Sequence, residues 1–101
     1  MVDIFYGAYY NEPHNDSCIV IADSLVKIGE VLGYKTRVST KTNKHKDGTL
    51  NTFTYKENGI SSAISRVKSG MLSKISDSVG RPVSIYRFVD NGRRVTSERL
   101  A

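Results

Sequence analysis

Two hydrophobic periodicities alternate along the chain, and their order limits the folds that it can adopt. Segments in which every second residue is apolar or aromatic are typical of strands, and they occur at 2–10, 34–40, 49–56 and 83–89. Segments with apolar residues at spacings of three and four are typical of helices, and they occur at 16–32 and 59–78. The predicted order is therefore strand, helix, strand, strand, helix, strand.

Turn-forming and capping residues agree with this division. Gly33 stands where a left-handed helix end is expected, and Asn58 is a candidate cap for the second helix, in which Gly70 marks a kink, a close contact or a break. The sequence 90–92 predicts a hairpin turn that returns through a short edge strand at 93–96, and residues 97–101 are expected to be loose.

The element order matches the ferredoxin-like βαββαβ fold, in which two helices cover one face of an antiparallel sheet. The class predicted is therefore α+β, and an α+β sheet with another strand order is the alternative. At 101 residues the chain is too short for two domains with separate cores, so 1–101 is treated as one domain.

The apolar positions predict which side chains fill the core. On the helices these include Cys18, Leu25, Ile64, Val67 and Met71. On the strands the aliphatic residues are expected to pack beneath the helices, and they are Ile4, Val38, Val83 and Ile85.

Charge is distributed unevenly. Residues 1–34 hold five acids and one lysine, a net charge of −4, whereas residues 35–101 hold 14 basic residues and five acids, a net charge of +9. This asymmetry predicts a polyanion such as RNA or single-stranded nucleic acid as partner, or else an acidic protein surface; a solvated basic surface is the plain alternative. No apolar run is long enough to span a bilayer, so no membrane partner and a cytoplasmic location are expected.

The open face of the predicted sheet combines aromatic and basic side chains. They are Phe5, Lys35, Arg37, Phe53, Tyr55, Tyr86 and Phe88. In this topology Phe5 would lie beside Phe53 and Tyr55, and flat rings flanked by cations suit single-stranded nucleic acid. The layout is similar to that of RNA-recognition-motif domains, although segment 47–55 keeps only an aromatic pair two residues apart, so no family is assigned. The rings could equally form a dimer interface, or a small second core beneath residues 90–101.

Two further basic groups are candidate phosphate contacts. The predicted hairpin tip at 41–46 carries Lys41, Lys44 and Lys46, and the last turn carries Arg93 and Arg94. Solubility and protection of an edge strand are the competing explanations.

No motif predicts catalysis. His14, Asp16 and Cys18 are close in sequence but lack the spacing of a metal site or a nucleophile pair, so no metal and no cofactor are expected. The function predicted is a non-enzymatic, homodimeric binder of RNA or single-stranded nucleic acid. The alternative is a small protein-binding inhibitor or viral accessory protein that uses the same surface.

Overall fold

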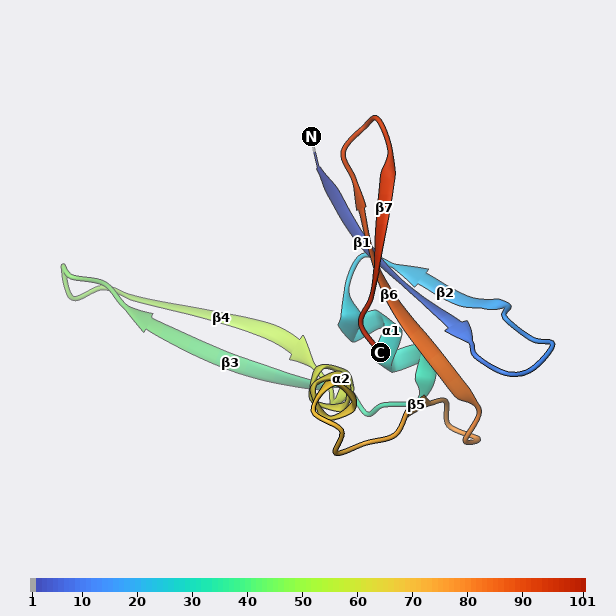
Figure 1. The fold of residues 1–101 in the computed structure, drawn as a ribbon. Helices are drawn as coiled ribbons and strands as arrows, with labels where there is room; N and C mark the ends of the chain where they lie inside the picture. Colours follow the sequence, from blue (N-terminus) through green and yellow to red (C-terminus); the bar gives the residue numbers. More distant parts are fainter. Residues whose placement is uncertain (1) are drawn as a thin grey trace.

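A five-stranded antiparallel sheet lies at the centre of the molecule (Figure 1). In the computed structural model, which describes residues 2–101, its strands are β1 (Asp3–Tyr10), β2 (Cys18–Ala22), β5 (Ile75–Ser76), β6 (Pro82–Asp90) and β7 (Val95–Arg99). The order is β2-β1-β6-β5, and β7 pairs with β6 along the same edge as β5. The strands predicted at 2–10 and 83–89 are confirmed, and they pair with each other at the centre of this sheet. The central place predicted for the strand at 49–56 is wrong, because that strand is not part of this sheet.

The remaining two strands form a separate hairpin, here called the arm. It consists of β3 (Arg37–Lys44) and β4 (Leu50–Glu57), paired in register from Arg37 opposite Glu57 to Lys44 opposite Leu50. Figure 1 shows the arm projecting away from the sheet, and every residue from 40 to 56 is exposed. The predicted hairpin is confirmed, but its strands do not enter the main sheet, so the ferredoxin-like order is not confirmed. The few apolar residues of the arm are divided between its two faces, and neither face can form a core.

The helix α1 (Leu25–Leu32) is shorter than predicted. It begins after Ser24, whose hydroxyl accepts a hydrogen bond from the Lys27 amide at 3.3 Å, and it ends at Gly33, which has a φ of 98°. The first half of the predicted helix at 16–32 is wrong, because residues 18–22 form β2. That segment contains three consecutive β-branched residues, which favour extended backbone once the edge of β1 is available for pairing.

The helix α2 (Ile60–Lys68) also ends early. The predicted helix at 59–78 is interrupted at Gly70, which has a φ of 80°, and Ile75 pairs with Val83 instead of continuing the helix. Of the kink, close contact or break considered at Gly70, the break is the one that the structure shows, and the predicted continuation to residue 78 is wrong.

The core lies between the two helices and the inner face of the sheet. α1 packs on β1 and β2, and α2 packs on α1 and β5. The buried apolar residues are Ala8, Ile28, Leu32, Ile60, Ala63, Ile64, Ile75, Val83 and Ile85. Leu25 and Val67 pack against this cluster, as expected. The predicted burial of Ile4, Cys18, Val38 and Met71 is wrong, because these residues lie outside the area that the helices cover.

The C-terminal residues are ordered, contrary to the expectation for 97–101. Residues 97–99 belong to β7. Beyond it, the Leu100 amide donates to the Ile85 carbonyl at 2.8 Å, and the Ile85 amide donates to the Ala101 carbonyl at 3.0 Å. Leu100 and Ala101 also pack against the core, so this end of the chain contributes to the fold.

The arm dominates the shape of the molecule. The principal extents are 58 × 36 × 24 Å, and the radius of gyration is 16.4 Å, compared with about 13 Å for a compact domain of this length. Neither α1 nor α2, the two helices of residues 2–101, has the length and apolar character needed to cross a membrane.

Candidate nucleic-acid interface

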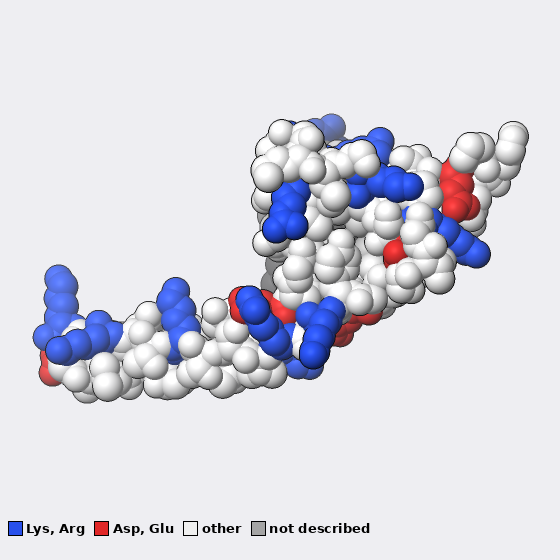
Figure 2. Space-filling view, turned by 90° about the horizontal axis from the view of Figure 1, so that it is seen from below, with Lys and Arg blue, Asp and Glu red and all other residues white. Residues whose placement is uncertain are grey.

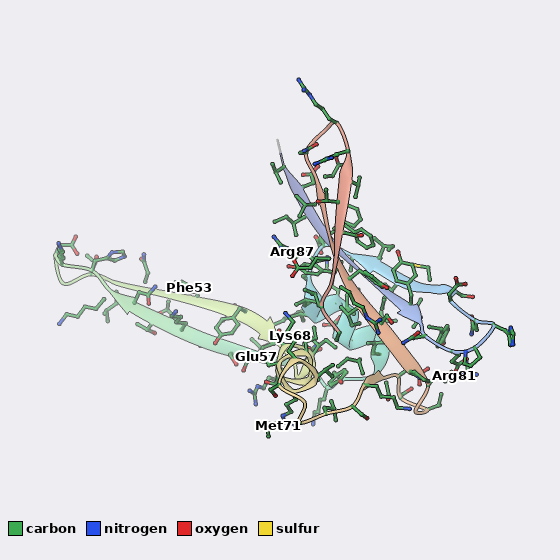
Figure 3. All side chains as sticks on the ribbon, viewed as in Figure 1. Phe53, Glu57, Lys68, Met71, Arg81 and Arg87 are labelled. Atoms are coloured by element: carbon green, nitrogen blue, oxygen red, sulfur yellow. The ribbon has the colours of Figure 1, made fainter. Side chains whose placement is uncertain are left out.

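One face of the arm interleaves aromatic and basic side chains. Residues directly opposite each other in an antiparallel pair share a face, so Lys41 lies beside Phe53 and Ser39 beside Tyr55. We call this surface the aromatic face of the arm; it consists of Arg37, Ser39, Lys41, Asn43, Asn51, Phe53, Tyr55 and Glu57. Phe53 projects from the middle of β4 (Figure 3). The two rings are 45% and 43% exposed, so each presents surface to solvent.

The opposite surface of the arm is composed differently. This threonine face consists of Val38, Thr40, Thr42, Lys44, Leu50, Thr52, Thr54 and Lys56. Thr42 and Thr52 share a cross-strand hydrogen bond between hydroxyls at 3.2 Å. It has no aromatic ring, so stacking is possible on one face of the arm only.

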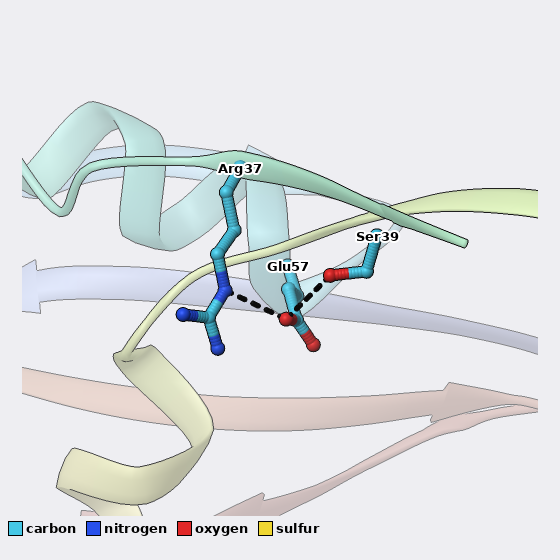
Figure 4. A network of polar contacts seen from close by, with 3 residues as sticks. All are labelled: Arg37, Ser39 and Glu57. Carbon is cyan, nitrogen blue, oxygen red and sulfur yellow. Dashed lines mark hydrogen bonds and ion pairs between the residues drawn. The ribbon is translucent and has the colours of Figure 1, made fainter. Parts of the chain in front are cut away.

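A polar network fixes the base of the arm. Glu57 accepts hydrogen bonds from the Arg37 guanidinium and the Ser39 hydroxyl, both at 2.7 Å (Figure 4). The Ser39 hydrogen bond, and then the Arg37 hydrogen bond and charge, lower the pKa of Glu57. The charge of Arg37 is therefore partly compensated, which makes this residue a weaker phosphate contact than the sequence suggested.

The Asn58 side chain connects the arm to the body. Its amide nitrogen donates to the Val26 carbonyl at 2.8 Å and to the Thr36 hydroxyl at 3.2 Å, and its oxygen accepts from the Ile60 amide at 3.2 Å. A Cβ on Gly29 would lie 2.5 Å from the Asn58 oxygen, so the glycine leaves the space that this connection requires.

The tip of the arm is a tight turn rather than the longer loop predicted at 41–46. Lys41 and Lys44 belong to β3, and the turn begins at His45. Asp47 accepts hydrogen bonds from the hydroxyl of Thr49 at 2.7 Å and from its amide at 2.9 Å, and these bonds lower the pKa of Asp47. Nε2 of His45 lies 2.6 Å from the side-chain amide nitrogen of Asn51.

The lysines of the arm have no acidic partner. The three ion pairs within residues 2–101 join Lys27 to Asp23, Arg37 to Glu57 and Arg87 to Glu98. Figure 2 shows Lys and Arg side chains spaced along the arm to its tip, with few acidic atoms beside them. The candidate lysines are all exposed, and they are Lys35, Lys41, Lys44 and Lys46. Lys56 is also exposed, although it was not among the residues predicted to contact phosphate. The two-residue repeat of β4 places Lys56 on the threonine face, opposite Val38.

The outer face of the main sheet holds a second group of aromatic rings. Phe88 stacks on Phe5 with 5.1 Å between ring centroids and on Tyr86 with 6.2 Å, and Tyr9 meets Tyr86 edge to face at 5.7 Å. The predicted proximity of Phe5 to Phe53 and Tyr55 is wrong, because the neighbours of β1 are β2 and β6.

Tyr9 is a member of this group that sequence reasoning missed, although it follows Phe5 at the strand repeat. Burial, and then the neighbouring Cys18, raise the pKa of Tyr9. A Cβ on Gly7 would lie 2.8 Å from the Tyr9 ring and 3.0 Å from the Phe88 ring, so the glycine lets these rings close over the backbone.

Arg93 and Arg94 lie in the turn between β6 and β7. The side-chain oxygen of Asn91 accepts hydrogen bonds from the backbone amides of Arg93 at 3.0 Å and Arg94 at 3.1 Å. These bonds fix the conformation of the turn. Figure 1 shows this hairpin pointing in a different direction from the arm. The structure therefore does not bring this basic pair together with the lysines of the arm.

The residues considered for chemistry do not form a cluster. His14 is in a turn with a φ of 66°, and Cys18 is exposed on β2. Within residues 2–101 no three His, Cys, Asp or Glu side chains are grouped so that they could hold a metal ion.

No protein-family model matches this chain, no curated protein matches it in sequence, and no solved structure matches it. Inferences about its function therefore depend on its own residues and their geometry.

Proposed function

We propose that this protein binds RNA or single-stranded nucleic acid through the aromatic face of the arm. The observation that carries the proposal is the placement of Phe53 and Tyr55 on one exposed face beside Lys41. Bases stack on flat rings irrespective of their identity, and lysines beside the rings contact phosphates.

The dimensions of the arm suit this role. Phe53 and Tyr55 are two residues apart on one strand, which separates their backbone positions by about 6.6 Å. Two neighbouring bases can therefore stack on two neighbouring rings. Lys46 adds positive charge at the tip, where Lys44 ends the threonine face. The acid at the tip, Asp47, is already engaged by Thr49.

The shape of the arm also favours an external ligand. An isolated two-stranded hairpin is only marginally stable in water, and the ribbon from 40 to 56 is covered by nothing in the body. A ligand that covers the rings and neutralises the lysines would stabilise the arm by mass action.

A protein partner is the second candidate, and a different observation favours it. On the threonine face, Val38 is 68% exposed and Leu50 is 64% exposed. A protein that covers these side chains would bury apolar surface without needing the aromatic rings.

The test compares two triple variants with the same loss of charge. One variant replaces Lys41, Lys44 and Lys46 by Gln, and the matched control replaces Arg66, Lys68 and Lys74 by Gln. Binding of a labelled oligouridine RNA is measured by fluorescence anisotropy over a range of salt concentrations. If the arm lysines contact phosphates, the slope of log affinity against log salt should fall by about 0.7 per lost contact in the first variant and stay unchanged in the control.

Equal slopes in both variants would show that only net charge matters and would overturn the proposal for the arm. Absence of oligouridine binding by the unaltered protein would overturn RNA binding by the arm and leave the protein partner as the candidate for this surface.

A further inference from the structure

A shallow groove of about 430 Å³ crosses the outer face of the main sheet. The rings of Tyr9, Tyr86 and Phe88 line it, and its volume lies within the range of about 300–1,000 Å³ that is usual for ligand sites. The planes of Tyr9 and Tyr86 are 85° apart. A planar group that stacks on one of these rings therefore lies edge-on to the other.

Polar side chains interrupt this aromatic lining. Ser84 is only 5% exposed and lines the groove, while Asn11 and Asp16 lie beside it. Within residues 2–101 no hydrogen bond or ion pair engages the Asp16 carboxylate. The groove therefore combines stacking surfaces with a carboxylate that is available to accept hydrogen bonds from a ligand.

We propose that this groove holds one guanine base of the bound RNA. The proposal depends on the RNA-binding function above and assigns to the groove a preference for one base. Bases of single strands are typically held by stacking on aromatic rings and by hydrogen bonds along their Watson–Crick edges.

The carboxylate selects guanine for a stereochemical reason. Guanine presents two adjacent donors, N1–H and the exocyclic amino group, which match the two oxygens of Asp16. Adenine and cytosine place an amino group beside an unprotonated ring nitrogen, and this nitrogen would repel the second oxygen. Uracil presents only one N–H, flanked by carbonyl oxygens.

The test titrates the full chain with free mononucleotides and follows its backbone amide resonances. Guanosine monophosphate should produce saturable shifts at Gly7, Ser84 and Tyr86. Inosine monophosphate, which lacks the exocyclic amino group, should bind about 5- to 150-fold more weakly, as expected for the loss of bidentate recognition. Adenosine monophosphate should bind more weakly still.

Two variants locate the preference. Asp16→Asn should remove the discrimination between guanosine and inosine monophosphates, because an amide offers one acceptor in place of two. Glu30→Gln is the control, because it removes an exposed carboxylate from α1 and should leave the discrimination intact. Both substituted residues are exposed, and the spectra of the free variants report whether each remains folded.

The outcomes separate this inference from the function of the arm. Equal binding of guanosine and adenosine monophosphates, or no shift at the groove at millimolar nucleotide, would overturn the guanine site even if oligouridine still binds the arm. Selective binding of guanosine monophosphate without any binding of oligouridine would support the groove and overturn the proposed role of the arm.

Discussion

Replacing the two rings of the arm by alanine should weaken RNA binding while leaving its salt dependence intact. Base stacking contributes about 1–3 kcal/mol per base, so Phe53→Ala or Tyr55→Ala alone should weaken binding by about 5- to 150-fold. The salt slope should stay nearly constant because neither ring contacts a phosphate. This pattern is the reverse of the one expected for the lysines.

The structure also bounds the effect of these substitutions on stability. Both side chains are almost half exposed and lie on an arm that is not part of the core, so the free energy of unfolding should fall by much less than the ~3–5 kcal/mol typical of truncating a buried Phe. A melting curve measured beside each binding curve therefore shows whether the variant has kept its fold.

Substitutions on the other face of the arm provide the matched control. Val38→Ala and Leu50→Ala remove apolar surface from the threonine face, which has no ring for stacking. The measurement is fluorescence anisotropy with labelled oligouridine at several salt concentrations. If Phe53→Ala binds RNA as tightly as the unaltered protein, or if Val38→Ala loses as much affinity, the assignment of stacking to the aromatic face is wrong.

Three further predictions concern the fold. Ile85→Ala, which empties a fully buried position, should lower the free energy of unfolding by about 2–5 kcal/mol in a denaturant titration, and a loss below 1 kcal/mol would contradict the core assignment. Gly29→Ala should displace Asn58 and speed amide exchange in the arm, whereas Gly48→Ala at the tip should leave exchange at the base of the arm unchanged. Because the pKa of Glu57 is lowered in the folded arm, the stabilisation from its contacts is present above the ordinary pKa of about 4.3 and is lost as the pH falls through the lowered value; carboxyl NMR titration showing an ordinary midpoint would refute this.

Much of the local structure could be predicted from the sequence. The alternation of Asn51, Phe53 and Tyr55 with Leu50, Thr52 and Thr54 correctly assigned the two faces of β4. The turn signal at Gly33 correctly placed the end of α1, because glycine adopts a positive φ there without strain. The end predicted for the second helix at residue 78 was wrong, since α2 ends at Lys68, before Gly70. These features depend on neighbours in sequence.

Other features depended on neighbours in space. Residues 18–22 fit a helical stripe as well as a strand, and pairing with β1 decided the outcome. Likewise, Val38 alternates as a core strand would, yet it is exposed because no helix reaches the arm.

The sequence by itself determined the two faces of the arm, its excess of lysine and the turns that bound it, since each follows from the two-residue repeat and from local backbone preferences. Only the tertiary structure decided that the arm leaves the sheet. It also decided that the rings on the main sheet form a group that excludes the rings of the arm, and this group consists of Phe5, Tyr9, Tyr86 and Phe88. The physical reason is that strand order depends on which strand edges pair through backbone hydrogen bonds and on which apolar faces the helices cover. Contacts between residues far apart in the chain decide both.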